Sequence, residues 1–402
     1  MMIKHLLTAM VICLGTTAWA AHPILAETAF LRALNIPILA EEPESQVAYA
    51  EVDEKEEQKL ITHAHLFGKC GGFESLAERA GDPQASLEQA FADFKSLQQK
   101  NLFYARGPLK SLQVTANPAI ESALQKVSEK NLQDTVAWLS SYPNRTCRDS
   151  HANEPVLAFR DRLLQMTALA GYPVQVELID HRSTRQKSIH LTIPGKTRPQ
   201  EIVVLGAHFD SVTQRWGESL APGADDNASG SANLLETLRI LLTQPQPERS
   251  IEFFWYAGEE YGLLGSAEIA AQYKAQKKDV VAVLQLDMTL YPGDGLFTLG
   301  SMTDFTSSWL RDYLSAINAA YLKVNILEGR CGYGCSDHAS WYKNSFPTLM
   351  PFEARLETMN PLIHSSQDVI SPKLNFSHSV VFTKIALIMA LDLGNSSERQ
   401  PY

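Results

Sequence analysis

The sequence predicts an α/β fold in which a mixed, mostly parallel central sheet is sandwiched between helices. Two observations support this prediction. From residue 119 onward, helical patterns alternate with short β-rich runs, and three of those runs are almost continuously apolar. Continuous apolar runs are typical of strands that are buried on both faces of a sheet, which is the environment of a central parallel strand.

The predicted elements follow one another in an order suited to this fold. Leucine spacing and apolar periodicity mark the helices, and β-branched and aromatic residues mark the strands. The expected elements are a helix over 157–170, a strand pair over 174–178 and 188–193, central strands over 201–206, 251–256 and 281–286, and helices over 232–242 and 380–393.

The first twenty residues have the pattern of a secretory signal peptide. Lys4 precedes an apolar run over residues 6–14, and Ala18-Trp19-Ala20 is a small-x-small cleavage pattern. The alternative is a membrane anchor, but the apolar run is far shorter than the roughly 20 residues that span a bilayer, and no later segment is expected to span one. We therefore expect a secreted protein, extracellular or periplasmic.

Residues 21–115 form a separate segment that holds none of the chemical motifs described below. The segment is acidic at first, and residues 76–102 then have an amphipathic helical pattern. We expect a helical propeptide that covers the active site or assists folding and that a processing protease removes. The alternative is a permanent accessory domain. The catalytic domain would then comprise residues 116–402, with its boundary near residues 108–118.

Composition narrows the classes of partner. The chain has 402 residues, of which 45% are hydrophobic and 20% charged, so it is globular. A net charge of -10 without a run of Lys or Arg argues against nucleic acid or an anionic membrane as a partner. We expect a monomer.

Two of the five cysteines are placed to form a disulfide. Cys331 and Cys335 flank Gly332-Tyr333-Gly334 and are close enough to bridge across a tight turn, and an exported protein keeps such a bond. Cys13 leaves with the signal peptide. Cys70 and Cys147 either pair with each other or remain thiols.

Polar side chains that can bind metal follow each of the three central strands. His208 and Asp210 follow the first, Glu259 and Glu260 the second, and Asp287 ends the third. Open α/β sheets place their sites at the carboxyl ends of strands. Taken singly, His208 and Asp210 are more typical of a hydrogen-bonded surface pair, whereas the paired glutamates favour a functional site and leave a solvated loop as the alternative. Asp287 would be expensive to bury without a cation.

Two other motifs carry ambiguous signals when read alone. Asp225 and Asp226 lie in a turn before a helix, where acidic residues are also ordinary helix caps. His364 follows an apolar pair late in the chain and would usually be a core or loop histidine.

Taken together, these motifs closely resemble the M28 family of metallopeptidases, and especially its secreted bacterial leucyl aminopeptidases. The resemblance covers roughly residues 119–395, and it implies a phosphorylase/hydrolase-like fold of the zinc exopeptidase type. The motifs stand in the family order: GAHFDS, PGADDNASG, AGEEYG, QLDM, CGYGCSDHASW and IHSSQD.

The resemblance implies two zinc ions and a role for each site residue. It makes Glu259 the general base that takes a proton from a water bridging the zinc ions, which leaves the attacking hydroxide, and Asp210 the acceptor of the second ring N–H of His208. Tyr333 would donate a hydrogen bond to the oxyanion. One zinc would be held by His208, Asp226 and Asp287, and the other by Asp226, Glu260 and His364. Three carboxylates and a hydroxide would balance the four positive charges.

The resemblance also implies an apolar pocket for the first side chain of a peptide or protein with a free amino terminus. Such a pocket favours leucine, phenylalanine or methionine, although Glu353 and Glu357 leave basic side chains open. The expected lining residues are Met288, Cys331, Tyr333, Cys335, Met350, Phe352, Leu356, Met359 and Ile363.

Three rival functions fit the same fold. Glutaminyl cyclisation uses a single zinc, and the full set of five ligands argues against it. A non-catalytic binding module would be expected to lack ligands or Glu259, and none is missing. A carboxypeptidase or deacylase would be indifferent to acetylation of the substrate amine.

Overall fold

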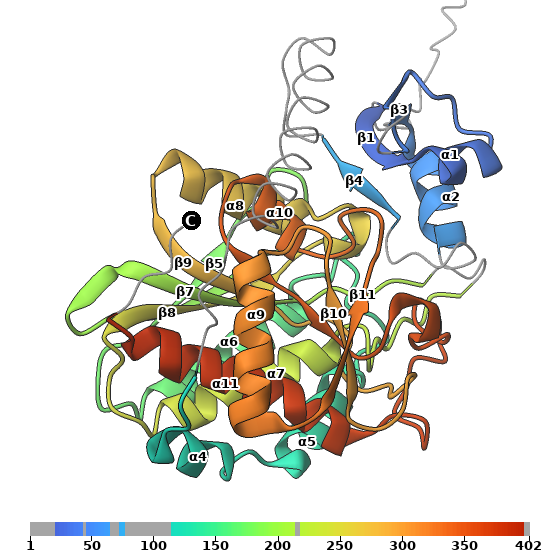
Figure 1. Ribbon diagram of the computed structural model, residues 1–402. Coiled ribbons are helices and arrows are strands. Elements are labelled where there is room, and N and C mark those ends of the chain that lie inside the picture. Colours follow the sequence, from blue (N-terminus) through green and yellow to red (C-terminus); the bar gives the residue numbers. More distant parts are fainter. Residues whose placement is uncertain (1–20, 43–45, 65–71, 77–113, 214–217, 398–402) are drawn as a thin grey trace, which may run out of the picture.

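The computed structural model describes residues 21–42, 46–64, 72–76, 114–213 and 218–397. A six-stranded sheet runs through the centre of the larger, C-terminal part of the chain in the order β12-β9-β7-β8-β6-β5 (Figure 1). Its strands are β5 (Gln175–Ile179), β6 (Ser188–Ile193), β7 (Arg198–His208), β8 (Arg249–Tyr256), β9 (Asp279–Gln285) and β12 (Thr348–Leu349). Strands β12, β9, β7 and β8 are parallel, whereas β6 runs antiparallel to β8 and β5 to β6, so the predicted mixed sheet is confirmed.

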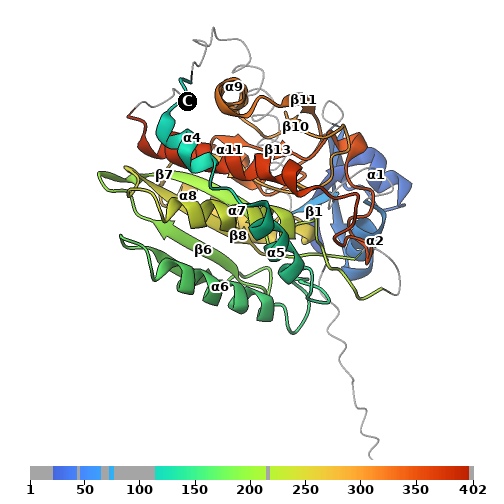
Figure 2. The same cartoon turned by 90° about the horizontal axis from the view of Figure 1, so that it is seen from below.

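Helices cover both faces of this sheet, and the side chains of β8 show why its sequence is continuously apolar. Ile251, Phe253 and Trp255 face a core shared with helices on one side, while Phe254 and Tyr256 face the other. The first core includes α4 (Pro118–Leu124), α5 (Glu129–Leu139), α6 (Glu154–Thr167), α7 (Ala228–Leu241), α9 (Ser308–Ile317) and α11 (Phe376–Asn395); the second includes α8 (Leu264–Ala275) and α10 (His338–Lys343). Seen from below, α5, α7 and α11 lie in front of the sheet (Figure 2).

A small second sheet lies beside the central one in the order β11-β10-β13. Its strands are β10 (Thr298–Met302), β11 (Asn325–Gly329) and β13 (Pro351–Phe352), and β10 runs parallel to β11. This part of the chain also contains two short 3₁₀ helices, η2 (Glu259–Tyr261) and η4 (Leu356–Thr358), and one short π-helix, η3 (Asn318–Leu322). The sequence analysis did not predict this sheet, because β13 has only two residues and the sequences of β10 (TLGSM) and β11 (NILEG) lack strict alternation of apolar and polar residues.

Helix α11 is longer than predicted and is apolar enough to cross a membrane by length and composition alone. An 18-residue window of this 20-residue helix has a mean hydropathy of 1.5, so the expectation that no later segment meets this criterion was wrong. In the fold, 67% of the helix window is buried inside the protein. The apolar composition of α11 is therefore that of a core helix.

The N-terminal segment contains a four-stranded antiparallel sheet, in the order β2-β3-β1-β4, with two helices. The elements are β1 (His22–Glu27), α1 (Thr28–Ala33), β2 (Ala40–Glu42), β3 (Val47–Val52), α2 (Glu54–Ala64) and β4 (Phe73–Ser75). The expectation of a helical segment was therefore incomplete, because β1 and β3 lack the alternation that would have marked them as strands.

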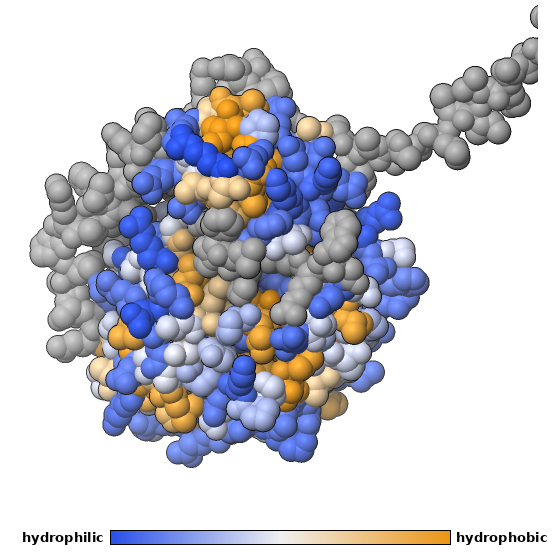
Figure 3. Space-filling view, turned by 90° about the vertical axis from the view of Figure 1, so that its right-hand side faces the viewer, coloured by the Kyte–Doolittle hydropathy of each residue, from blue (hydrophilic) through white to orange (hydrophobic). Residues whose placement is uncertain are grey.

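Some of the N-terminal predictions lie outside the described residues. The signal peptide falls there, as does the amphipathic helix expected over 76–102 after its first residue. The face of the molecule that carries the N-terminal sheet mixes hydrophilic and apolar patches among its coloured residues (Figure 3). The apolar core of the N-terminal segment includes Cys147, Val212, Tyr261 and Leu264, so the segment packs against the rest of the chain.

Candidate active site

The three central strands deliver their polar residues to one edge of the sheet. Strand β7 ends at His208, β8 leads into the η2 turn with Glu259 and Glu260, and Asp287 follows β9 by two residues. Because β9, β7 and β8 are adjacent and parallel, their carboxyl ends meet. The turn before α7 adds Asp226 to this edge, and the loop before α11 adds His364.

Asp226 lies between two imidazoles. Its Oδ1 is 3.0 Å from Nε2 of His208, and its Oδ2 is 2.9 Å from Nε2 of His364. On the far side, Nε2 of His208 is 3.2 Å from Asp287 Oδ1, and Nε2 of His364 is 2.9 Å from Glu260 Oε2. Two groups of three potential ligands result, with Asp226 in both, and the ligand atoms within each group lie within 4.8 Å of one another.

These groups have the donor chemistry of a metal site. Both carboxylate oxygens of Asp226 and Oε1 of Glu260 are buried, and apart from the two imidazoles beside Asp226 they meet no hydrogen-bond donor in the part of the chain that the structure describes. A buried carboxylate without a donor is costly unless a cation compensates it. Imidazole and carboxylate ligands suit zinc.

The carboxylates of the cluster also favour positive charge beside them. Burial opposes a charged imidazole, yet the neighbouring carboxylates outweigh it, above all Asp287 for His208 and Glu260 for His364. They raise the pKa of His208 well above its usual value and that of His364 to about 10. The carboxylates thus favour positive charge at these two positions, so the residues fit a metal centre.

The two adjacent aspartates of the turn have different environments. Asp225 Oδ1 accepts hydrogen bonds from the backbone N–H groups of Leu290 (2.9 Å) and Thr289 (3.2 Å), and its Oδ2 accepts one from Asn360 Nδ2 (3.0 Å). The carboxylate of Asp225 is therefore satisfied by protein donors. Asp226 is the member of the pair that faces the imidazoles, as the resemblance implied.

Asp368, which the sequence analysis did not assign, holds this turn in place. Its carboxylate accepts the backbone N–H of Asp225 at 3.0 Å and that of Asp226 at 3.0 Å. The signal that could have found it is its place in the motif IHSSQD, four residues after His364.

Asp210 lies next to His208 but not in the expected arrangement. Nδ1 of His208 is 3.2 Å from the backbone carbonyl oxygen of Asp210 and 3.6 Å from its carboxylate. The carboxylate instead accepts the backbone N–H of Glu259 at 3.0 Å and of Glu260 at 3.3 Å. Asp210 thus orients His208 through its main chain and positions the η2 turn through its side chain.

Glu259 is buried at the same edge of the sheet. Burial is the main reason that its pKa is raised well above the usual value, and the nearby charge of His208 opposes that shift. A carboxylate in a desolvated position is a stronger proton acceptor than one in water, which is the property that a general base needs.

Comparisons with known proteins agree with this geometry. The chain matches peptidase family M28 over residues 188–387. It is 36% identical over 289 residues to leucine aminopeptidase 1 of Trichophyton equinum, a match that covers 68% of this chain and 76% of that protein. The chain belongs to peptidase family M28. It is a metalloaminopeptidase, and thus a hydrolase.

Solved structures extend the comparison into the N-terminal segment. The LapA aminopeptidase of Legionella pneumophila superposes with a TM-score of 0.80 at 27% identity, covering 94% of this chain and 99% of that one. A glutaminyl cyclase of Porphyromonas gingivalis shares only the fold, with a TM-score of 0.53 at 20% identity over 65% of this chain and 97% of that one. The expected placement among bacterial members is not confirmed, because curated relatives such as the T. equinum protein are fungal.

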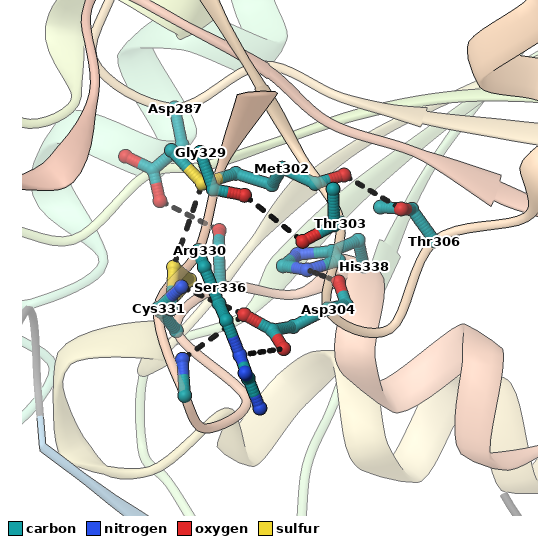
Figure 4. Close-up of a disulfide and its surroundings, with 12 residues drawn as sticks. Asp287, Met302, Thr303, Asp304, Thr306, Gly329, Arg330, Cys331, Ser336 and His338 are labelled. Carbon is teal, nitrogen blue, oxygen red and sulfur yellow. Dashed lines mark hydrogen bonds and ion pairs between the residues drawn. A yellow bond between two sulfur atoms is a disulfide. The ribbon is translucent and has the colours of Figure 1, made fainter. Parts of the chain in front are cut away.

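The predicted disulfide of this M28 peptidase is present between Cys331 and Cys335, and the residue after it contacts a candidate ligand (Figure 4). Ser336 Oγ donates a hydrogen bond of 2.6 Å to Asp287 Oδ2 and accepts one of 3.1 Å from Gln285 Nε2. The sequence analysis matched the motif that contains Ser336 but gave the serine no role.

Replacing Ser336 with alanine is expected to lower metal affinity or kcat/KM about 10- to 100-fold, because outer partners orient a ligating carboxylate. Metal titration and steady-state kinetics measure both quantities. Ser250→Ala is a matched control, since its buried hydroxyl bonds Gly195 N (3.0 Å) and Pro199 O (2.8 Å) near the opposite ends of the strands. A Ser336→Ala enzyme with both the metal affinity and the kcat/KM of the unmodified enzyme would contradict the prediction.

All the residues expected to line a pocket for the first side chain gather in one apolar cluster beside Asp287. Met302 belongs to the same cluster and was not predicted. The members are Met288, Met302, Cys331, Tyr333, Cys335, Met350, Phe352, Met359 and Ile363, with Leu356 packed against them.

Glu353 does not support the alternative of a basic substrate side chain. Its carboxylate is buried and accepts the backbone N–H groups of Tyr291 (2.7 Å) and Asn360 (2.8 Å). Burial, and then the nearby Asp225, raises its pKa well above the usual value. Glu353 is thus engaged by the main chain, and the apolar character of the cluster remains.

The N-terminal sheet of the M28 peptidase packs directly on the turn that carries Glu259 and Glu260. Ser75 N in β4 donates a hydrogen bond of 3.2 Å to Gly262 O, and Tyr261 and Leu264 lie in the apolar core of the N-terminal segment. Arg148 donates to both carboxylate oxygens of Glu57 at 2.8 and 2.9 Å, and lies 4.8 Å from the centre of the Tyr261 ring.

Cys147 lies in the same interface core and carries a free, buried thiol whose pKa is raised by burial. Cys70, the other cysteine of the open question, lies outside the described residues.

Proposed function

We propose that this M28 peptidase is a two-zinc aminopeptidase that removes the first residue of peptides with a free amino terminus. The observation that carries the proposal is the position of Asp226, whose two oxygens face His208 at 3.0 Å and His364 at 2.9 Å. A carboxylate that presents one oxygen to each of two ligand groups suits a pair of metal ions.

In this proposal, His208, Asp226 and Asp287 hold one zinc, and Asp226, Glu260 and His364 hold the other. When bound, two zinc ions would lower the pKa of a water molecule and polarise the scissile carbonyl. Glu259 accepts the proton of the attacking water and returns it to the leaving amine. The hydrogen bonds of 3.0 and 3.3 Å from the backbone N–H groups of Glu259 and Glu260 to Asp210 keep this base beside its neighbouring ligand.

Tyr333 donates a hydrogen bond to the oxygen that becomes negative in the transition state. Support comes from its position on the disulfide loop, where it is 6% exposed and packs in one cluster with Met288, the residue after Asp287.

The substrate's first side chain enters the apolar cluster that includes Met288, Met350, Phe352, Met359 and Ile363. Leucine, phenylalanine and methionine are the favoured residues, and the name of the T. equinum relative, leucine aminopeptidase, supports this preference. One methylene changes such discrimination by about 1–3 kcal/mol, so the preference is broad.

Maturation completes the proposal. Residues 1–20 direct secretion, and residues 21–115 form a propeptide that a processing protease separates from a monomeric enzyme with neither a nucleic-acid nor a membrane partner. The packing of β4 against the η2 turn supports a role in covering or stabilising the site before cleavage. The alternative is a permanent accessory domain. The structure of LapA supports it, because the match covers 94% of this chain and so extends into the N-terminal segment.

The ion pair between Glu57 and Arg148 gives a test of how the N-terminal segment is held to the rest of the protein. Replacing Glu57 with glutamine removes a charge-assisted pair worth about 1.5–3 kcal/mol, so the nicked segment is expected to dissociate roughly 10- to 100-fold more readily. Size-exclusion chromatography of nicked protein under reducing conditions measures this. Glu51→Gln, at an exposed position of β3, is the control. A segment that stays bound equally tightly in the Glu57 variant would contradict the role of this pair.

The decisive assay for the whole proposal compares leucine p-nitroanilide with its N-acetylated form, using enzyme before and after limited proteolysis and with or without a zinc chelator. We expect cleavage of the free-amine substrate only, abolished by the chelator and restored by zinc. Hydrolysis of the acetylated substrate would support a deacylase instead. Cyclisation of N-terminal glutamine would support the cyclase. Binding of a peptide without turnover would support the binding module.

A further inference from the structure

Asp304 connects the segment between β10 and α9 to the base of the disulfide loop (Figure 4). Its Oδ2 accepts the backbone N–H of Cys331 at 2.7 Å and that of Gly332 at 3.0 Å. Hydrogen bonds from two consecutive N–H groups to one carboxylate are charge-assisted and fix the direction of the backbone. The other oxygen faces Arg330 Nε at 3.3 Å, but the arginine side chain is 76% exposed, so this pair adds little.

Asp304 is itself held from two directions. The backbone carbonyl oxygen of Asp304 lies 3.2 Å from Nε2 of His338, a fully buried side chain at the start of α10. Burial lowers the pKa of His338 to about 3, so the ring is neutral, and the Nε2–H tautomer donates to this carbonyl. One residue earlier, Thr303 N donates to Gly329 O at 3.0 Å. These two hydrogen bonds hold the backbone at Thr303 and Asp304 in place, and with it the carboxylate of Asp304.

The loop that Asp304 holds carries Tyr333. The disulfide between Cys331 and Cys335 closes the loop, and Gly332 adopts a φ of +82°, a conformation that glycine permits without steric cost. Both N–H groups bound by Asp304 belong to the two residues directly before Tyr333. The disulfide sets the width of the loop, and the carboxylate sets its orientation relative to β10.

We propose that Asp304 is a positioning residue that sets the place of the Tyr333 hydroxyl for catalysis. This inference rests on the proposed role of Tyr333 as a donor to the oxyanion. An Asp304 variant should leave the metal ligands unchanged, because the carboxylate contacts the disulfide loop and not the ligand cluster. It should lower kcat more than it raises KM, since a misplaced donor weakens the transition state in particular.

A double-mutant cycle tests this. Every variant is expressed as the full chain, activated by the same limited proteolysis and loaded with zinc before the assay. Tyr333→Phe alone is expected to lower kcat about 100-fold or more, and Asp304→Ala alone about 10- to 100-fold. On the Tyr333→Phe background, Asp304→Ala should lower kcat by less than about threefold, because the donor that it positions is absent. Asp304→Asn retains one acceptor and should recover part of kcat.

The matched control is Glu268, whose carboxylate also accepts two consecutive backbone N–H groups, those of Arg182 (2.9 Å) and Ser183 (3.0 Å). Glu268→Ala should lower the melting temperature but leave kcat unchanged. If Tyr333→Phe leaves kcat unchanged, the proposed role of Tyr333 is wrong. If that variant lowers kcat while the Asp304 variants do not, or lower it equally in both backgrounds, the positioning role is overturned. Should Asp304→Ala fail to fold, Asp304→Asn gives the same cycle.

Discussion

Replacing Glu259 with glutamine is expected to lower kcat on leucine p-nitroanilide about 10²- to 10⁴-fold, the range attributed to general acid–base catalysis. Glutamine keeps the size of the side chain but neither accepts nor returns a proton. Its backbone N–H still reaches Asp210, 3.0 Å away, so the η2 turn keeps its shape. Steady-state kinetics of the activated enzyme, with zinc content measured on the same sample, gives the result directly.

Zinc content makes the Glu259 experiment specific. The variant should bind as much zinc as the unmodified enzyme, because Glu259 is not among the proposed ligands. Glu252→Gln is the control, since Glu252 is also buried but accepts the hydroxyl of Tyr273 on the face of the sheet covered by α8. A Glu259→Gln enzyme that keeps more than a tenth of the activity at full zinc content would exclude Glu259 as the base.

Replacing Asp226 with alanine is expected to abolish measurable activity and to reduce bound zinc from two ions to one or none. Asp226 is the member common to both candidate ligand groups, so its loss takes one ligand from each. It also leaves His208 and His364 facing an empty position, where both imidazoles were within 3.0 Å of a carboxylate oxygen. Elemental analysis of dialysed protein, together with the rise in melting temperature on zinc addition, measures the change.

Asp287→Ala is the informative comparison for the Asp226 variant. Asp287 belongs to only one of the two groups, so this variant should retain the zinc held by Glu260 and His364. The two variants should therefore differ in metal content even if both are inactive. Two tightly bound zinc ions in Asp226→Ala would rule out a bridging role for Asp226.

Much of the fold and the site follows from local sequence. The apolar runs that form β7, β8 and β9 predicted central parallel strands. A run without polar alternation is typical of a strand that is covered on both faces, and parallel sheets are covered in this way. That arrangement explains why residues 79 positions apart, His208 and Asp287, lie side by side: the carboxyl ends of adjacent parallel strands meet at one edge. The short strands of the N-terminal segment gave no comparable signal, since a run of three residues has no measurable period.

The sequence by itself determined which residues bring chemistry to the sheet edge and that their types suit zinc. Only the tertiary structure decided the geometry around them. It separated Asp225, satisfied by backbone donors, from Asp226, and it directed the Asp210 carboxylate to the η2 turn. It also brought Ser336 to the candidate ligand Asp287, and Asp304 to the disulfide loop. These contacts join segments far apart in the chain, and hydrogen bonds of that kind depend on how the elements pack, a property that no local pattern carries.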